Sequence, residues 1–103
     1  MKRTYCIKAV GVTFEGRQRV IRTLQEGDPL RFVAEPDNSY DRFAVRIETS
    51  DGKQVGYISK EYNRSYSENL LSGKVSYLAK VSSITGGGIA TAYGLNIEVT
   101  AIE

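Results

Sequence analysis

Hydrophobic and polar residues alternate along several short stretches of this chain, which is the pattern of a β-strand with one buried face. The clearest case is the last segment, where Leu95, Ile97 and Val99 alternate with polar neighbours. Strands are predicted at residues 4–14, 30–34, 43–49, 53–58, 75–83 and 89–102. This pattern indicates a mainly β fold of about six antiparallel strands.

Turn-forming residues separate the predicted strands. Residues 35–41, Glu-Pro-Asp-Asn-Ser-Tyr-Asp, are so rich in turn formers that a loop of some length is expected there. Asp51-Gly52 predicts a hairpin turn of type I′, in which both central residues have positive φ. Gly11 indicates a bulge or a close backbone approach in the first strand, and the three glycines at 86–88 mark the last reversal.

Residues 15–24 follow a helical period instead. Apolar residues recur there at helical spacing, so a short helix is expected to follow the first strand. These apolar residues are Val20, Ile21 and Leu24. The basic residues on the remaining face, which we expect to be a solvated surface, are Arg17, Arg19 and Arg22.

Residues 59–72 form a second helical segment. Tyr62 and Tyr66 lie four residues apart, on one face of a helix. Ser65 and Glu68 match the spacing of a capping box, which would restart the helix midway. We therefore expect either one broken helix or two short ones, ended by the glycine that follows.

These elements together predict an α+β, mainly β fold. Short antiparallel strands with two or three short helices are typical of a small, partly open barrel of the OB-like or SH3-like kind. The chain has 103 residues, enough to bury one core, and neither a repeat nor a linker divides it. We expect residues 1–103 to form a single domain.

The composition excludes several kinds of chemistry. The chain has one cysteine, Cys6, and no histidine, so an internal disulfide and the usual mixed zinc sites cannot form. The lack of histidine also removes the commonest general base and the nucleophile systems that depend on it. We expect no catalytic residue, no metal and no cofactor.

Charge and hydropathy add little to this picture. A net charge of +2 is too small to indicate nucleic-acid binding without clustering on one face. Neither a signal-peptide core nor an apolar run of the roughly 20 residues needed to cross a bilayer is present. We expect a cytoplasmic protein with no membrane partner.

Four motifs, in this order and spacing, resemble the HIRAN domain. They are Gly-Val-Thr-Phe-Glu-Gly-Arg-Gln at 11–18, Glu-Pro-Asp-Asn-Ser-Tyr-Asp at 35–41, Ala-Val at 44–45 and Val-Gly-Tyr-Ile at 55–58. The resemblance spans roughly residues 5 to 82 and rests on the spacing of several motifs rather than on one. It implies an OB-like fold.

The resemblance also implies a function. HIRAN domains occur at the front of helicase-like remodelling ATPases and as free-standing bacterial domains, and the best understood type grips the 3′ end of single-stranded DNA. Carried over by motif, Phe14 and Tyr40 bracket the terminal bases and Asp41 accepts a hydrogen bond from the 3′ hydroxyl. The implied setting is DNA repair or remodelling, with any ATPase supplied by a separate chain.

The chain departs from the family pattern at three places. Ser39 stands where the loop usually has proline, and Phe43 stands where asparagine is common. Thr13 and Phe14 replace the arginine-tyrosine pair of the end-binding eukaryotic members. The arginine that would meet a phosphate from the first strand is therefore missing at position 13.

The residues themselves support a nucleic-acid site. A single-strand binder needs aromatic faces for bases and cations for phosphates, and a ring in a polar loop, such as Tyr40, is hard to bury. Tyr5, Tyr57 and Tyr77 lie on alternating strand positions, which favours core packing, although Tyr57 also counts as a candidate. The full set of candidate binding residues is Thr13, Phe14, Asn38, Tyr40, Asp41, Arg42, Tyr57 and Lys60.

Two other classes of function stay open. Glu35, Asp37 and Asp41 offer oxygen ligands at loop spacing, which suits a Mg²⁺-dependent nuclease, although such carboxylates are also ordinary turn residues. A protein-interaction module is the other, in which the same groove or an exposed edge strand takes a peptide.

Overall fold

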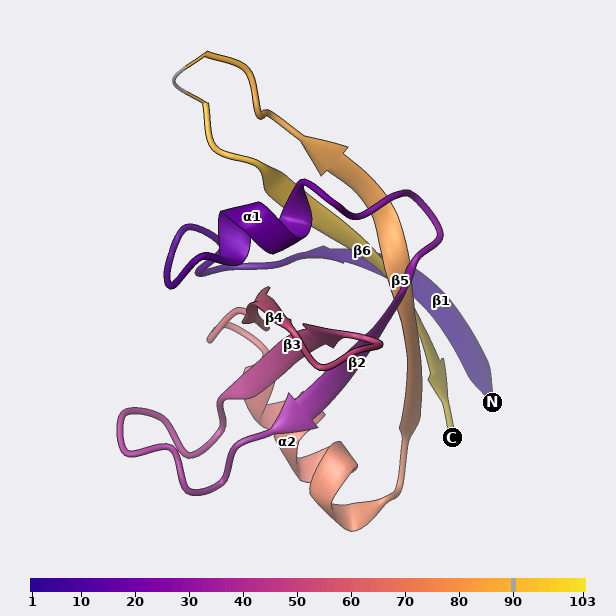
Figure 1. Cartoon of the computed structure of the whole chain (residues 1–103). Coiled ribbons are helices and arrows are strands. Elements are labelled where there is room, and N and C mark those ends of the chain that lie inside the picture. The colour runs from indigo at the N-terminus through magenta and orange to yellow at the C-terminus, as the bar shows by residue number, and fades with distance from the viewer. Residues whose placement is uncertain (90) are drawn as a thin grey trace.

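The computed structural model describes residues 1–89 and 91–103 and shows a curled antiparallel sheet with two helices (Figure 1). The strands are β1 (Lys2–Lys8), β2 (Pro29–Ala34), β3 (Val45–Thr49), β4 (Gln54–Tyr57), β5 (Ser76–Thr85) and β6 (Gly94–Ile102). The helices are α1 (Arg17–Ile21) and α2 (Asn63–Ser72). The strand order is β1-β6-β5-β2-β3-β4 and every pairing is antiparallel. The predicted α+β, mainly β class is confirmed.

The sheet curls into a partly open barrel, and two pairings that involve few residues define its shape. β2 joins β5 through only two residue pairs, Pro29 with Lys80 and Leu30 with Ala79, so the sheet bends sharply between its two three-stranded halves. At the other side, an isolated bridge links Val10 to the end of β4. The N–H groups of Val10 and Tyr57 each donate to the other's carbonyl at 2.9 Å. The two edges of the sheet therefore meet at one point without closing along their length.

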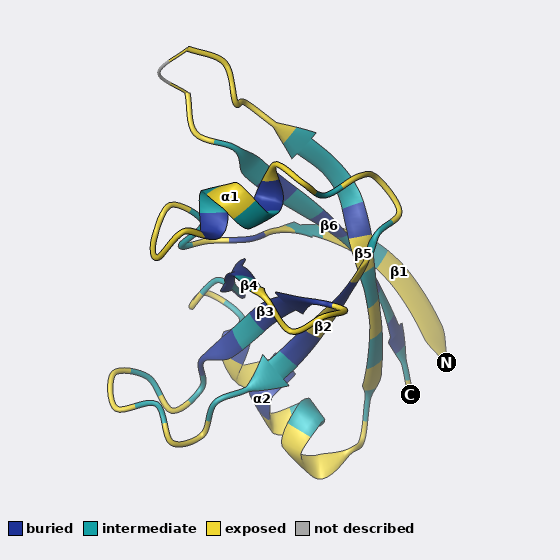
Figure 2. Cartoon of the chain, in the orientation of Figure 1, coloured by how far each residue is buried: buried dark blue, intermediate teal, exposed yellow. Residues whose placement is uncertain are grey.

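The core lies inside this curl. Leu95, Ile97 and Val99 are fully buried, as their alternation predicted, and they meet Val45 and Ile47 from the other half of the sheet within one apolar cluster. Each such side chain contributes roughly 1.5–3 kcal/mol when it leaves water. Figure 2 shows the buried positions along β3 and β4, while the loop between β2 and β3 stays largely exposed. The core thus provides a rigid base for that loop.

The segment that joins β1 to α1 differs from the predicted strand and helix. β1 ends at Lys8 rather than at residue 14, because Gly11 has φ 66° and turns the chain out of the sheet. α1 spans only Arg17–Ile21, since Gly16 precedes it with φ 77°. Ile21 is fully buried, in line with the predicted apolar face.

The predicted solvated face of α1 is wrong at Arg17. Arg19 and Arg22 are exposed, but Arg17 is buried and retains only 7% of its accessible surface. Its guanidinium folds back onto the preceding turn, where Nη1 donates to the Gly11 carbonyl at 2.6 Å. A helical period places the side chain on a face but cannot show this backward contact.

α2 is one unbroken helix. It begins at Asn63 with Tyr62 in the cap position, so the predicted capping box at Ser65 does not form. Glu68 instead lies 3.4 Å from Arg64 in an i,i+4 ion pair. Gly73 ends the helix with φ 75°, as predicted, and donates its N–H to the Asn69 carbonyl at 2.9 Å. Within the described residues, neither helix is long and apolar enough to span a membrane.

The two remaining turns refine the sequence predictions. The predicted β3–β4 hairpin is confirmed, but its turn is not type I′, because Asp51 does not have positive φ. The N–H of Gly52 donates to the Thr49 carbonyl at 3.0 Å and only the glycine is left-handed, which is a type I turn with a glycine bulge. β6 begins at Gly94 rather than at residue 89, and Ala90 lies outside the described residues.

Candidate nucleic-acid interface

Three segments far apart in the sequence converge on one pocket of about 310 Å³. They are the β1–α1 turn, the loop between β2 and β3, and the segment from the end of β4 to the start of α2. The residues that line this loop pocket are Val10, Gly11, Asn38, Tyr40, Asp41, Ala44, Tyr57, Ile58, Lys60 and Asn63. The five lining residues also predicted from sequence are Asn38, Tyr40, Asp41, Tyr57 and Lys60.

Asn38 holds the loop in shape. Its side-chain Oδ1 accepts hydrogen bonds from the backbone N–H groups of Tyr40 at 2.9 Å and Asp41 at 3.1 Å. Its Nδ2 donates to Oε1 of Glu35 at 3.0 Å. This Asx-type turn explains why asparagine suits the position. The backbone that carries the Tyr40 ring and the Asp41 carboxylate is therefore fixed locally.

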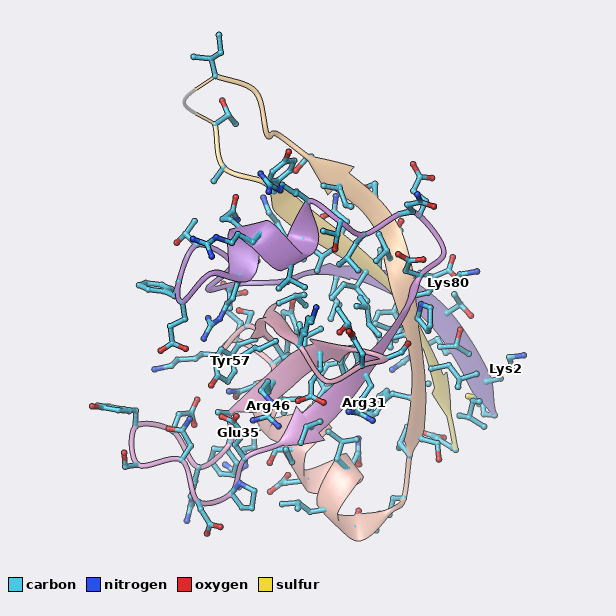
Figure 3. The ribbon with its side chains drawn as sticks, in the orientation of Figure 1. Lys2, Arg31, Glu35, Arg46, Tyr57 and Lys80 are labelled. Atoms are coloured by element: carbon cyan, nitrogen blue, oxygen red, sulfur yellow. The ribbon has the colours of Figure 1, made fainter. Side chains whose placement is uncertain are left out.

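Glu35 connects the loop to the sheet. Its Oε1 also accepts a hydrogen bond from the Tyr57 hydroxyl at 3.0 Å. Its Oε2 accepts from Nη1 of Arg46 at 3.1 Å. Figure 3 shows Glu35, Arg46 and Tyr57 side by side at the base of the loop. One carboxylate thus ties the loop to both β3 and β4.

A buried carboxylate extends this connection across the sheet. Glu48 is 5% exposed, and its Oε2 accepts from Nε of Arg46 at 2.8 Å. Its Oε1 accepts from Nε and Nη2 of Arg31 at 3.0 and 2.8 Å. Two guanidinium groups compensate the burial of this charge, as a buried carboxylate requires. This series of ion pairs, from Arg31 through Glu48 and Arg46 to Glu35, anchors the loop pocket.

Asp41 is held as a carboxylate at the mouth of the pocket. Its Oδ1 accepts from the backbone N–H of Phe43 at 2.9 Å, and its Oδ2 accepts from Nδ2 of Asn63 at 2.9 Å. These two bonds, with the nearby positive charge of Lys60, lower the pKa of Asp41 below its ordinary value of 3.8. A carboxylate has about four lone-pair sites, so Asp41 can still accept another donor.

Two aromatic rings near the pocket face the solvent. Tyr40 is 95% exposed and Phe14 is 63% exposed, and neither ring takes part in an aromatic pair within the described residues. Phe14 does not line the pocket but lies on the turn that follows Gly11, a pocket residue. Exposed rings of this size leave free faces on which a base can stack.

Tyr57 differs from these two rings. It is half-buried, its hydroxyl is held by Glu35, and the guanidinium carbon of Arg17 lies 5.2 Å from its ring centre. Its predicted packing role and its place in the pocket therefore coexist. It forms a fixed wall of the pocket rather than a free stacking platform.

The two candidate cations do not share a surface. Lys60 lines the pocket, whereas Arg42 lies over the ring of Phe43 at 4.8 Å. Arg64 lies near the same ring, at 5.2 Å. Thr13 is exposed beside Phe14 and does not line the pocket. Of the two predicted cations, Lys60 lines the pocket together with Asp41, and Arg42 does not.

The acidic cluster that a nuclease would need is not assembled. Within residues 1–89 and 91–103, no group of three or more His, Cys, Asp or Glu side chains lies close enough together to hold a metal ion. Glu35 is engaged by three donors, and Asp41 is engaged by two.

Asn63 is the polar side chain of the pocket that the sequence did not predict. It is 4% exposed at the start of α2, and its amide orients the Asp41 carboxylate. An asparagine at the beginning of a polar helical segment gives no sign of this role, because its partner lies 22 residues away. Ala44 and Ile58 complete the floor of the pocket as buried apolar residues.

A second pocket, of about 410 Å³, lies where α2 approaches the ends of β1, β5 and β6. Four tyrosines line this tyrosine pocket, namely Tyr5, Tyr62, Tyr66 and Tyr77. The hydroxyls of Tyr5 and Tyr66 lie 2.6 Å apart, and Asn69 donates to the Tyr77 hydroxyl at 2.8 Å. The rings of Tyr66 and Tyr77 pack on Phe32, at 5.6 and 6.1 Å. Tyr5 and Tyr77 thus pack against the core, as predicted.

These features define a small, partly open antiparallel barrel with the loop pocket at one rim. The HIRAN domain model matches residues 3–100, and the chain belongs to the HIRAN domain family. No curated protein matches the sequence.

Two solved structures share this fold. The crystal structure of the HIRAN domain of human HLTF is 18% identical with a TM-score of 0.74, over 95% of this chain and 74% of that one. The crystal structure of a protein from Lactobacillus plantarum is 18% identical with a TM-score of 0.70, over 99% of this chain and all of that one. At this level of identity the likeness concerns the fold alone.

Proposed function

We propose that this chain binds single-stranded DNA and captures its 3′ end through the free hydroxyl, in DNA repair or remodelling. HIRAN domains are a family of DNA-binding domains, and this chain belongs to that family. The observation that carries the finer proposal is the meeting of Tyr40, Asp41 and Lys60 at one pocket. They supply an exposed ring, a fixed carboxylate and a cation.

Each of the three residues has a separate task in this proposal. The last base stacks on the Tyr40 ring, a contact worth roughly 1–3 kcal/mol. Lys60 attracts a backbone phosphate. Asp41 accepts a charge-assisted hydrogen bond from the 3′ hydroxyl, whereas a 3′ phosphate would be repelled by its charge. Asp41 therefore distinguishes a free end from a blocked one.

Hydrogen bonds within the pocket hold the binding groups in position in the free protein, which favours this recognition. Asn38 fixes the loop backbone, Asn63 orients the carboxylate, and Glu35 ties the loop to Tyr57. Groups that are already ordered lose less entropy on binding. The domain itself carries out no reaction in this proposal, and a separate helicase or ATPase chain would supply any motor activity.

The test is fluorescence anisotropy with a labelled short DNA strand that ends in a 3′ hydroxyl or a 3′ phosphate. We expect the wild-type protein to bind the hydroxyl end about tenfold more tightly, as loss of one charge-assisted bond would predict. Asp41→Asn should remove that difference. Asp37→Asn changes the charge of the same exposed loop and should preserve it.

Other results would redirect the proposal. Equal binding of both strands by the wild-type protein would contradict end capture. Binding that is weak, indifferent to the end and lost at modest salt would instead favour the protein-interaction alternative, with a peptide in the same groove.

A further inference from the structure

Arg17 lies directly behind the loop pocket. Its Nη1 donates to the carbonyl of Gly11 at 2.6 Å, and its guanidinium stacks on the ring of Tyr57. Gly11 and Tyr57 both line the loop pocket. The backbone N–H of Arg17 donates to the carbonyl of Phe14 at 3.0 Å, which holds the exposed Phe14 ring on the same turn. Arg17 thus joins the pocket to the second exposed ring.

This buried cation is poorly compensated. Its Nε has no hydrogen-bond partner within the described residues and is closed off from solvent. Its Nη2 lies 3.5 Å from Oε2 of Glu15, the one acidic partner of Arg17 within the described ion pairs. The Glu15 side chain is 79% exposed, whereas that of Arg17 is 8% exposed. A buried guanidinium is normally matched by well-placed acceptors, so Arg17 has capacity for a stronger anion.

Glu15 is held in its place at a cost. It has φ 53°, and it is the one residue other than glycine with positive φ in residues 1–89 and 91–103. Such a conformation is unfavourable for a residue with a Cβ, and residues of this kind cluster at functional sites. The exposed Glu15 carboxylate therefore sits at Nη2 of Arg17, on a backbone conformation that a residue with a Cβ rarely adopts.

We propose that Nη2 of Arg17 binds a backbone phosphate of the captured strand, and that the Glu15 carboxylate occupies this phosphate site in the free protein. This inference rests on the proposed binding of single-stranded DNA. The incoming phosphate displaces Glu15, which swings into solvent, while the bond from Nη1 to Gly11 stays in place. Arg17 supplies the cation that Thr13 does not provide, from the next turn of the chain.

This arrangement makes Glu15 a competitor of the DNA. Each binding event must break the Glu15–Arg17 pair, so removal of the Glu15 charge should tighten binding. Glu15→Gln is suited to the test because glutamine keeps the size of the side chain and bears the same backbone strain. Its matched control is Glu26→Gln, because Glu26 is also exposed and its replacement changes the net charge equally. Thermal melting verifies that both variants fold.

The experiment measures anisotropy with a short strand in which one phosphate at a time is replaced by a neutral methylphosphonate. We expect Glu15→Gln to bind the unmodified strand roughly threefold more tightly than Glu26→Gln, the size of an exposed ion pair. The gain should vanish when one particular linkage is neutral, because Arg17 then has no anion to bind.

The other outcomes separate this inference from the function on which it rests. Equal affinities of the two variants, or a gain that persists whichever linkage is neutral, would overturn the phosphate site while leaving DNA binding intact. Failure of the wild-type protein to bind any of these strands at low salt would overturn the proposed function and this site with it.

Discussion

The loop pocket and the tyrosine pocket both border the start of α2 and use their aromatic residues in opposite ways. In the tyrosine pocket, the rings of Tyr66 and Tyr77 pack on each other with centres 4.7 Å apart, and their hydroxyls find partners within the protein. At the loop pocket, Tyr40 and Phe14 face the solvent. The larger pocket is therefore the one in which the Tyr66 and Tyr77 rings and hydroxyls are already engaged within the protein.

This difference teaches that volume and aromatic content do not identify a binding site by themselves. Burial raises the pKa of Tyr66 far above its ordinary value, and the bond to Tyr5 adds to the effect, so this hydroxyl remains neutral. Asp41 shows the reverse, because hydrogen bonds to its ionised form lower its pKa. One region stabilises the fold with neutral groups, and the other holds a charge ready at the surface.

The largest effect is expected from Tyr66→Ala, which breaks the tyrosine pocket. Removal of this buried ring should lower the free energy of unfolding by about 4 kcal/mol, through lost burial and the cavity left behind. Urea denaturation measures the change. DNA affinity, measured where the variant is still folded, should stay close to wild type, and a selective loss would show that this pocket also contacts DNA.

Glu35→Gln should affect both stability and binding. It weakens the contact with Arg46 and alters the acceptor shared by Asn38 and Tyr57. We expect the free energy of unfolding to fall by about 1–2 kcal/mol, in the range for one hydrogen bond to a charged group. DNA affinity should also fall, because the loop loses its anchor. Unchanged affinity in the folded variant would show that Asn38 alone maintains the loop.

Tyr40→Ala should separate binding from stability at the loop pocket. The ring is almost fully exposed, so the melting temperature should not change. Affinity for single-stranded DNA should fall roughly tenfold, the value of one base stack. Tyr40→Phe keeps the ring and should retain the affinity, and a tenfold loss in that variant would point to the hydroxyl instead.

The smallest effect concerns the charge of Asp41. Its pKa lies below 3.8, so the stability contributed by its two hydrogen bonds is present above pH 3.8 and is lost as pH falls through the lowered pKa. NMR titration of the carboxyl carbon should show this midpoint, and Asn63→Ala should raise it. The pKa of Asp51 is also lowered, by a bond from Thr49, and should not move in that variant.

The sequence predicted most of the sheet and much of the pocket. Alternation located the strands, because a sheet with one buried face imposes a period of two on Leu95, Ile97 and Val99. The motif at 35–41 located the loop residues, since Asn38 and its neighbours form a local turn whose bonds span only a few residues.

The rest depends on contacts that no local pattern records. Asn63 reaches Asp41 across 22 residues, and Arg17 folds back against the Gly11 carbonyl instead of into solvent. Helical spacing placed Arg17 correctly on its helix but could not show that the turn before the helix would lie beneath it. The turn type at Asp51 was wrong because positive φ occurs at Gly52 and not at Asp51, whereas a type I′ turn needs it at both.

The single bridge between Val10 and Tyr57 is a point at which the loop pocket could open locally. Both residues line that pocket, and the bridge itself consists of two reciprocal hydrogen bonds. We expect so short a bridge to open at a lower free-energy cost than global unfolding, which would separate two of the residues that line the pocket. A DNA strand that binds only the closed form of the pocket would stabilise that form by mass action. Amide exchange at these two N–H groups therefore gauges how often the empty domain is ready to bind.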